Sequence, residues 1–261
     1  MEHLSSNKLK WKLLHRLRYR LSCLLSGSPL ILFPLARMYL AFSSRTQYAA
    51  PVTKKTKLVI EGFPRSGNTF AVTAFRMAQT SDVVIGHHLH ASAQIVAAVR
   101  CGIPCLVLVR NPRDAVLSFL VRAPWLTARL ALQQYIHFYS QIEPMQNQYV
   151  IATFEQIISN FGLVIEQINK IFNTDFNMFE YTQTNVNECF SRLDLLVMQE
   201  SDDPTVQNAL GYRPKIVRGQ LKNSIAASLE APELVYLLDE AQGIYTRFRA
   251  KTEVLKKTPA L

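Results

Sequence analysis

The ten-residue segment EGFPRSGNTF combines the glycine spacing of a phosphate-binding loop with an unusual choice of cation. Gly62 and Gly67 are spaced as in the motif GxxxxGK[ST], and Thr69 takes its Ser/Thr position. Asn68 replaces the motif's lysine, and Arg65 lies inside the loop instead. The flanking runs LVIEG and TFAVTAFRMAQ predict a strand and a helix, so the loop would present backbone N–H groups to an anion. A strand, turn and helix without a ligand is the alternative.

A second segment, RNPRDAVLS, follows the apolar run CLVLV, which predicts a strand buried on both faces. Arg110 ends this strand, Pro112 suits the first position of a helix, and Ser118 lies two turns into that helix. Arginine binds phosphate in a planar, bidentate manner, and a serine hydroxyl can donate a further hydrogen bond. A magnesium-dependent nucleotide triphosphatase would need the loop lysine and an acidic residue at such a strand end. Cations in both places favour a bound anion over a metal.

Three histidines lie in the run GHHLH after a predicted strand. Histidine can remove a proton near neutral pH, which suits acid–base chemistry on an alcohol. His87 would point away from a site formed by His88 and His90 if the segment is extended, because alternate side chains then face opposite sides. A zinc site and a polar loop without function are the alternatives, although no Cys or carboxylate nearby has ligand spacing.

Short apolar runs alternate with segments of helical spacing from residue 58 onward. We expect strands at 58–62, 82–86, 105–109 and 149–153, and helices at 69–79, 92–102, 112–122, 125–142, 155–172, 186–200 and 232–250. The polar segments between the last helices are expected to be loops. Strands that alternate with helices predict an α/β fold with a central parallel sheet flanked by helices.

These motifs resemble those of a known enzyme family. FPRSGNTF is similar to the 5′-phosphosulfate loop of the sulfotransferases that use 3′-phosphoadenosine 5′-phosphosulfate (PAPS), and VRNPRDAVLSF is similar to their 3′-phosphate segment. The resemblance is strong over 58–122 and extends to about 175, and it implies a three-layer fold like that of P-loop kinases. Near the C-terminus, KIVRGQLKNS resembles a further 3′-phosphate loop, which Arg218 and Gly219 match in register.

The resemblance also implies roles for single residues. It places the phosphosulfate over the loop of Arg65, Ser66, Gly67, Asn68 and Thr69, with Arg65 stabilising the charge on the leaving oxygen, and it needs no metal. Arg110 and Ser118 would hold the 3′-phosphate. His88, which precedes a leucine as in many members, would be the base, with His90 as the alternative. A P-loop nucleotide or small-molecule kinase and a non-catalytic, nucleotide-binding membrane adaptor are the competing readings.

Basic residues are concentrated near the N-terminus. Residues 1–57 hold eleven Lys or Arg and one acidic residue, whereas residues 58–261 carry equal numbers of both signs, so the net charge of +10 belongs to the tail. This excludes a broad nucleic-acid-binding surface on the body. We therefore divide the chain into a tail, 1–57, ending in a linker at 43–57, and a sulfotransferase domain, 58–261.

The tail begins with KLKWKLLHRLRYR, whose pattern predicts a basic amphipathic helix at a membrane surface. Residues 21–42 are apolar, but their longest uncharged run is shorter than the roughly 18 residues that span a bilayer. Three hypotheses remain for residues 1–42: contact with a membrane surface or a partner, a short signal-anchor, or a helix packed on the core. The protein would accordingly be cytoplasmic or peripherally associated with a membrane, or, with a signal-anchor, a single-pass membrane protein.

The acceptor has no motif of its own. Small-molecule, glycan and lipid-linked alcohols all remain open, as does the oligomeric state. We expect its pocket in segments 120–145 and 175–215, where aromatic residues either line the pocket or belong to the core: Trp125, Tyr135, Phe138, Tyr139 and Tyr212.

Overall fold

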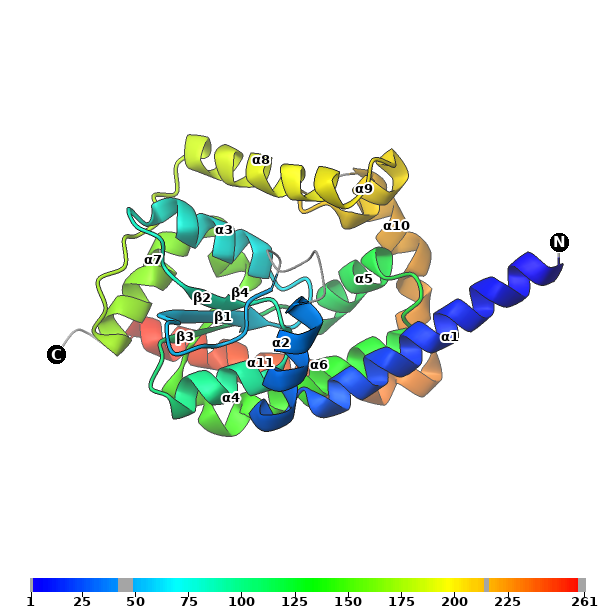
Figure 1. Cartoon of the computed structure of the whole chain (residues 1–261), viewed down its shortest axis with the longest axis horizontal. Coiled ribbons are helices and arrows are strands. Elements are labelled where there is room, and N and C mark those ends of the chain that lie inside the picture. Colours follow the sequence, from blue (N-terminus) through cyan, green and yellow to red (C-terminus); the bar gives the residue numbers. More distant parts are fainter. Residues whose placement is uncertain (1, 42–48, 214–215, 258–261) are drawn as a thin grey trace.

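A parallel sheet of four strands forms the centre of the protein (Figure 1). The structure is a computed structural model that describes residues 2–41, 49–213 and 216–257. The strands are β1 (Leu58–Gly62), β2 (Ile85–His87), β3 (Cys105–Val109) and β4 (Val150–Thr153), in the order β2-β1-β3-β4. Parallel neighbours require crossover connections, and helices supply them here. All strand residues are buried, as expected when helices cover both faces.

Side chains of successive strand residues enter two separate cores. Leu58, Ile60 and Leu106 pack in one core with α3 (Asn68–Ala78), α7 (Phe154–Phe172) and α8 (Gln183–Glu200). Val59 and Val107 pack in the other, with α4 (Ser92–Arg100), α5 (Pro112–Arg122), α6 (Ala128–Ile142) and α11 (Val235–Lys257). This alternation follows from the two-residue period of a strand. The predicted three-layer α/β fold is confirmed.

Several predicted boundaries and two predicted loops are wrong. β2 covers 85–87 rather than 82–86, because its pairing with β1 starts at Ile85 and continues to His87. The segments expected to be loops contain α9 (Pro204–Leu210) and α10 (Ile216–Ala226). Arg218 is the only buried residue in α10, so this helix has no apolar stripe for a pattern to reveal. Short 3₁₀ helices complete the described chain: η1 (Glu143–Gln148), η2 (Ala227–Leu229) and η3 (Pro232–Leu234).

The N-terminal segment forms two helices, α1 (Glu2–Leu25) and α2 (Pro29–Ala41). The C-terminal part of α1 contacts α6 while its N-terminal part projects beyond the body, and α2 contacts α4 (Figure 1). Tyr19 and Trp125 make an edge contact with ring centroids 5.4 Å apart, and the Arg16 side chain donates to the Trp125 carbonyl oxygen at 2.6 Å. The Ala93 amide donates to the Ser26 carbonyl oxygen at 2.9 Å. No helix in the part of the chain that the structure describes is both long and apolar enough to cross a membrane.

The expected linker, 43–57, contacts the sheet where the structure describes it. Residues 43–48 lie outside the described part. Ala50 forms an antiparallel bridge with His87 at the free edge of β2, and Val52 is buried, with its N–H donating to Gln94 Oε1 at 2.9 Å. This stretch therefore covers the edge strand, which would otherwise expose unpaired backbone groups.

Candidate active site

The two predicted anion-binding segments lie side by side because β1 and β3 are neighbours. The strands approach closely at their carboxyl ends, where a Cβ on Gly62 would lie 2.5 Å from the Leu108 carbonyl oxygen. The Tyr139 hydroxyl donates to that same oxygen at 2.6 Å and accepts from the Phe63 amide at 3.3 Å. These contacts join the loop after β1 to the end of β3, so the two segments adjoin in the structure.

The loop after β1 turns into α3 through two residues with left-handed backbone. Arg65 has φ 70° and Gly67 has φ 94°. The Arg110 side chain donates to the Arg65 carbonyl oxygen at 2.9 Å and braces this conformation. Asn68 begins α3 with its side chain donating to the Phe63 carbonyl oxygen at 3.0 Å. Backbone N–H groups of a helix's first turn have no intrahelical partner, and these face an anion in phosphate-binding loops.

The Arg65 side chain bridges two distant segments. Its Nε donates to Ser118 Oγ at 3.0 Å, and its Nη2 donates to the Gly211 carbonyl oxygen at 2.9 Å. The resemblance assigns Arg65 and Ser118 to opposite ends of a nucleotide, but here they are in direct contact. The Ser118 hydroxyl accepts from Arg65, which leaves its own proton available for a further acceptor.

Cationic side chains converge around this loop. Burial, and then the charge of Arg122, lowers the pKa of Arg65 to about 9. Burial, followed by the charge of Arg110, also lowers the pKa of Lys222. Arg110 stacks on the Phe154 ring at 3.9 Å, and its buried Nε has no hydrogen-bond partner within the described residues. A bound anion would relieve this repulsion and satisfy that donor.

Arg218 and Gly219 lie beside the same cavity, but on the helix α10 rather than on the loop that the resemblance predicts. The guanidinium of Arg218 donates to the carbonyl oxygens of Asn208 and Arg213 at 3.0 Å. These contacts connect the end of α9 to the start of α10. Arg218 therefore orders the wall of the cavity, and contact with a phosphate stays a prediction.

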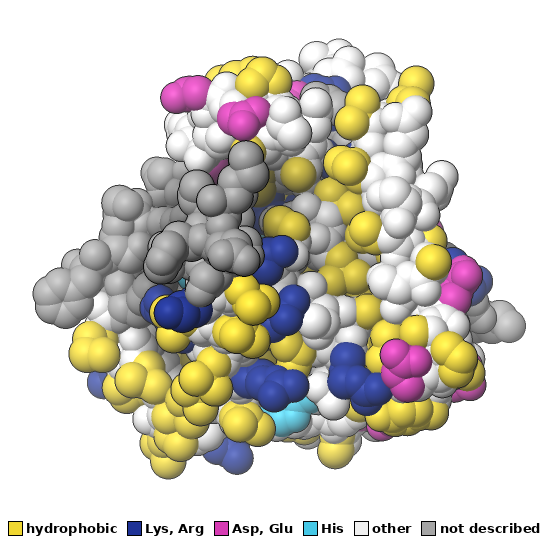
Figure 2. All heavy atoms as spheres, turned by 90° about the vertical axis from the view of Figure 1, so that its right-hand side faces the viewer, with side chains coloured by type: hydrophobic (Ala, Val, Ile, Leu, Met, Phe, Trp, Pro, Cys, Tyr) yellow, Lys and Arg dark blue, Asp and Glu magenta, His cyan; other side chains and the backbone are white. Residues whose placement is uncertain are grey.

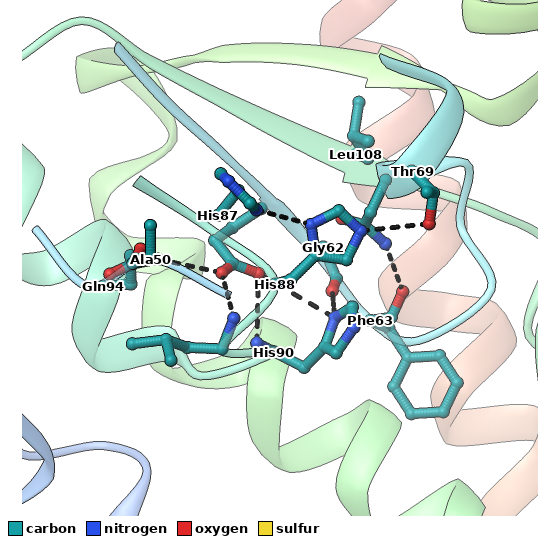
Figure 3. A network of polar contacts seen from close by, with 12 residues as sticks. Ala50, Gly62, Phe63, Thr69, His87, His88, His90, Gln94 and Leu108 are labelled. Carbon is teal, nitrogen blue, oxygen red and sulfur yellow. Dashed lines mark hydrogen bonds and ion pairs between the residues drawn. The ribbon is translucent and has the colours of Figure 1, made fainter. Parts of the chain in front are cut away.

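The histidines form a chain of hydrogen bonds that starts at α3 (Figure 3). Arg76 Nη2 lies 3.0 Å from His87 Nε2, His87 Nδ1 lies 2.7 Å from His88 Nδ1, and His88 Nε2 lies 3.0 Å from Thr69 Oγ1. Burial, and then neighbouring charges, lowers the pKa of His87 to about 3 and the pKa of His88 well below its ordinary value. Both rings are therefore neutral at pH 7.

Arg76 determines which atoms donate and which accept along this chain of hydrogen bonds. A guanidinium only donates, so His87 Nε2 accepts and the single proton of His87 is on Nδ1. His88 Nδ1 then accepts, and the proton of His88 is on Nε2, where it is donated to Thr69 Oγ1. His88 thus has no free lone pair for an acceptor's proton, and the Thr69 hydroxyl proton can point toward the loop.

His90 has the opposite arrangement. Its Nδ1 lies 2.8 Å from the Gly62 carbonyl oxygen, which only accepts, so Nδ1 carries the proton and Nε2 carries a lone pair. Burial lowers the pKa of His90 to about 4; the Gly62 hydrogen bond opposes this shift, and the charge of Arg122 adds to it. Among these three histidines, His90 has the nitrogen that can accept a proton.

Glu61, inside β1, holds the turn formed by His88, Leu89 and His90, called here the histidine turn. The sequence analysis did not recognise Glu61 as functional. Its carboxyl accepts from the amides of Leu89 and His90 at 2.7 and 3.2 Å, and from Gln94 Nε2 at 3.0 Å. Complete burial raises the pKa of Glu61 to about 8. His88 and His90 have φ of 60° and 50°, so the carboxyl secures a strained turn. A single acidic residue within an otherwise apolar strand is the sequence feature that could have identified Glu61.

A cavity of about 780 Å³ joins these groups. Its polar end includes Arg65, Arg110 and Lys222, and His88 and His90 line it as well. Figure 2 shows Lys and Arg side chains near the middle of the face at the right of Figure 1, between apolar side chains. Basic groups therefore lie on a face that also carries apolar surface.

The sequence analysis missed some residues that line the cavity and misassigned others. Arg122, one helical turn after Ser118, and Lys222 on α10 both line the cavity. The first was detectable from i, i+4 spacing, whereas the second lies on an unpredicted helix. Tyr212 lines the cavity; of the other aromatic candidates, Trp125 packs on α1, and three belong to the core: Tyr135, Phe138 and Tyr139.

No protein-family model matches the sequence, and no curated protein matches it. Among solved structures, the protein is similar to a mouse sulfotransferase, SULT7A1, complexed with PAP. The TM-score is 0.48 at 14% sequence identity, over 79% of this chain and 90% of that one. A likeness at this level supports no assignment of activity. Among the described residues, no group of three or more His, Cys, Asp or Glu side chains is placed to hold a metal ion.

Proposed function

We propose that the protein is a sulfotransferase that moves the sulfuryl group of PAPS to a hydroxyl or amine acceptor. One observation carries the proposal: a cationic cluster, the N-terminus of α3 and the neutral base His90 line a single cavity. The cluster supports binding of a polyanion, and the base supports removal of a proton from an acceptor. The similarity of the two anion segments to sulfotransferase motifs supports the choice of co-substrate.

The residues present fit a nucleotide with phosphates at both ends. The first-turn amides of α3 and the hydroxyl of Thr69 suit the 5′ end, and Arg110, with its unpartnered Nε, suits the 3′-phosphate. Ser118 and Arg65 contact one another and line the same cavity. PAPS supplies an activated sulfuryl group when bound.

Proton and charge movements follow from the side chains. His90 accepts the acceptor's proton on Nε2 while the acceptor oxygen bonds to sulfur. The bond between sulfur and the 5′-phosphate oxygen breaks, and its electron pair stays with the phosphate. Arg65 stabilises the charge that develops on this oxygen, a kind of interaction that strengthens in the transition state. His88 is a positioning residue that orients the Thr69 hydroxyl.

The test is a transfer assay on the full chain with two donors. PAPS and a panel of alcohols and amines are incubated with the protein, and products are followed by a gain of one sulfuryl group in mass spectrometry. Parallel reactions contain ATP and magnesium. Sulfated product with PAPS alone supports the proposal, whereas phosphorylated product with ATP would identify a kinase. Binding of 3′-phosphoadenosine 5′-phosphate (PAP), which is PAPS without its sulfuryl group, with no transfer to any acceptor would favour a non-catalytic nucleotide-binding protein.

A further inference from the structure

The outward face of α1 is apolar although it faces solvent. Six leucines on this helix are 52% to 72% exposed: Leu9, Leu13, Leu14, Leu17, Leu21 and Leu24. The opposite face contains the polar and aromatic groups that contact the body. There, Arg16 and Tyr19 contact Trp125, and the His15 and Trp125 ring centroids are 5.9 Å apart. The helix therefore packs on the protein with its polar side and leaves its leucines unpartnered.

The exposed leucines continue onto the next helix and are accompanied by positive charge. α2 adds Leu30 and Met38, which are 87% and 57% exposed. Exposed basic residues border the α1 leucines: Lys10, Lys12, Arg18 and Arg20. Glu2 is the only acidic residue among the first 57. Leucine and tryptophan with flanking Lys and Arg, whose stems extend their charges toward headgroups, are typical of helices that lie in a bilayer interface.

The inner faces of the same helices form a wall of the candidate active site. Tyr19, Ser22 and Cys23 of α1, Ser26 of the connection and Leu32 of α2 line the cavity that contains His90. Phe119 adds an apolar ring beside Tyr19. None of these side chains carries a full charge, so this end of the cavity suits the uncharged chain of an alcohol better than a charged sugar.

We propose that the outward faces of α1 and α2 bind an anionic lipid bilayer, and that the acceptor is an amphiphilic alcohol presented by that bilayer. The second clause rests on the proposed sulfuryl transfer. Charge complementarity selects this occupant, because the basic residues match anionic headgroups while the leucines enter the interface. If a second copy of the chain bound this face, the basic residues of the two α1 helices would face one another. This repulsion disfavours a second copy as the occupant.

The first experiment measures binding without any activity. The full chain is floated with vesicles of phosphatidylcholine alone or with about one third phosphatidylglycerol. The variant Leu13→Ser/Leu17→Ser/Leu21→Ser removes apolar groups that do not line the cavity, and Leu163→Ser/Leu195→Ser is the control on other exposed leucines. We expect binding to the anionic vesicles only, about tenfold weaker for the triple variant and unchanged for the control.

Three results would overturn this surface assignment: no binding of the wild type to anionic vesicles, equal binding by the triple variant, or equal loss by the control. Circular dichroism spectra and PAP affinity verify that each variant is folded. Size-exclusion chromatography without lipid supplies the competing outcome, since a dimer that the triple variant converts to a monomer would assign the face to a second copy of the chain.

A second experiment tests the acceptor. Transfer from PAPS is measured with a long-chain alcohol in anionic vesicles and with a short-chain alcohol in solution. We expect the triple variant to lose most transfer to the vesicle-borne alcohol and to retain transfer to the soluble one. Equal transfer by wild type and variant to both alcohols would contradict a bilayer-presented acceptor. Transfer to other acceptors of the panel but to neither alcohol would also contradict it. Absence of transfer to every alcohol and amine of the panel would refute the proposed function, whereas vesicle binding would still decide the surface.

Discussion

The two ends of the cavity are built from different kinds of sequence. The cationic end consists mainly of two short segments, each a strand, a turn and the start of a helix, on neighbouring strands. The apolar end combines α1 and α2 with Phe119 of α5. Local turn chemistry therefore builds the cationic end, while contacts between distant segments shape the apolar end. The histidines lie between these two ends.

His90→Ala has the largest expected effect, because it removes the proposed base at the junction of the two ends. Loss of general base catalysis commonly reduces kcat by ~10²–10⁴-fold. PAP affinity measured by calorimetry should not change, because His90 is assigned to the acceptor. His88→Ala is the matched comparison and should cost about tenfold or less, equivalent to one hydrogen bond. A larger loss for His88→Ala than for His90→Ala would return the role of base to His88.

The pH dependence of the same step follows from its protonation. His90 must be neutral to accept a proton, and its pKa is lowered to about 4. The rate kcat/KM should therefore fall as pH decreases through about 4 and stay level between 5 and 7. A fall centred near 6.5 would show an unperturbed histidine and contradict the buried, cation-flanked environment.

Arg65→Ala removes the cation inside the loop after β1, at the cationic end. We expect kcat to decrease by ~10²–10³-fold, as for other groups that stabilise developing charge. Arg192→Ala is the control, since this exposed arginine on α8 pairs only with Glu188, at 2.8 Å, among the contacts described. Wild-type kcat in Arg65→Ala would exclude its role in the transition state and leave it as a brace for Gly211.

Arg110→Ala distinguishes the 3′-phosphate from the rest of the nucleotide. A charge-assisted hydrogen bond contributes about 1.5–3 kcal/mol, which corresponds to a roughly 10- to 150-fold increase in Kd for PAP. AMP lacks the 3′-phosphate and should lose much less affinity. Because Arg110 also braces the Arg65 carbonyl oxygen, equal losses for PAP and AMP would mean that it only supports the loop.

Glu61→Gln is expected to change stability rather than transfer or nucleotide binding. Because the folded state raises the pKa of Glu61 from 4.5 to about 8, this group stabilises the fold fully below pH 4.5 and loses that contribution as pH rises to 8. The wild type should lose stability relative to Glu61→Gln across this range, on the order of 1 kcal/mol per pH unit. Urea unfolding at several pH values measures it, and parallel curves for the two proteins would contradict a buried, protonated Glu61.

The strand and loop chemistry of the cationic end was predictable because it is local. Glycine spacing, the arginine after CLVLV and the proline at the start of α5 all act within a few residues. α10 could not be predicted, since it buries Arg218 instead of an apolar stripe. The protonation of His88 was equally hidden, because it depends on Arg76, eleven residues before His87. The contact between Arg65 and Ser118 depends on tertiary packing of α5.

The placement of α1 illustrates the same limit. Its helical pattern was readable, but only the structure shows that its leucines face outward while Tyr19 and Cys23 line the cavity. An amphipathic pattern reveals two faces and does not say which of them packs on the body.

Calorimetric titration of the full chain with PAP, in the absence of metal, tests the central claim most directly. AMP, and ATP with magnesium, are the comparisons. The account predicts that PAP binds at least tenfold more tightly than AMP, because a 3′-phosphate engages the cationic end. Tighter binding of ATP with magnesium, or equal affinity for PAP and AMP, would contradict it and withdraw the roles assigned to Arg110 and His90.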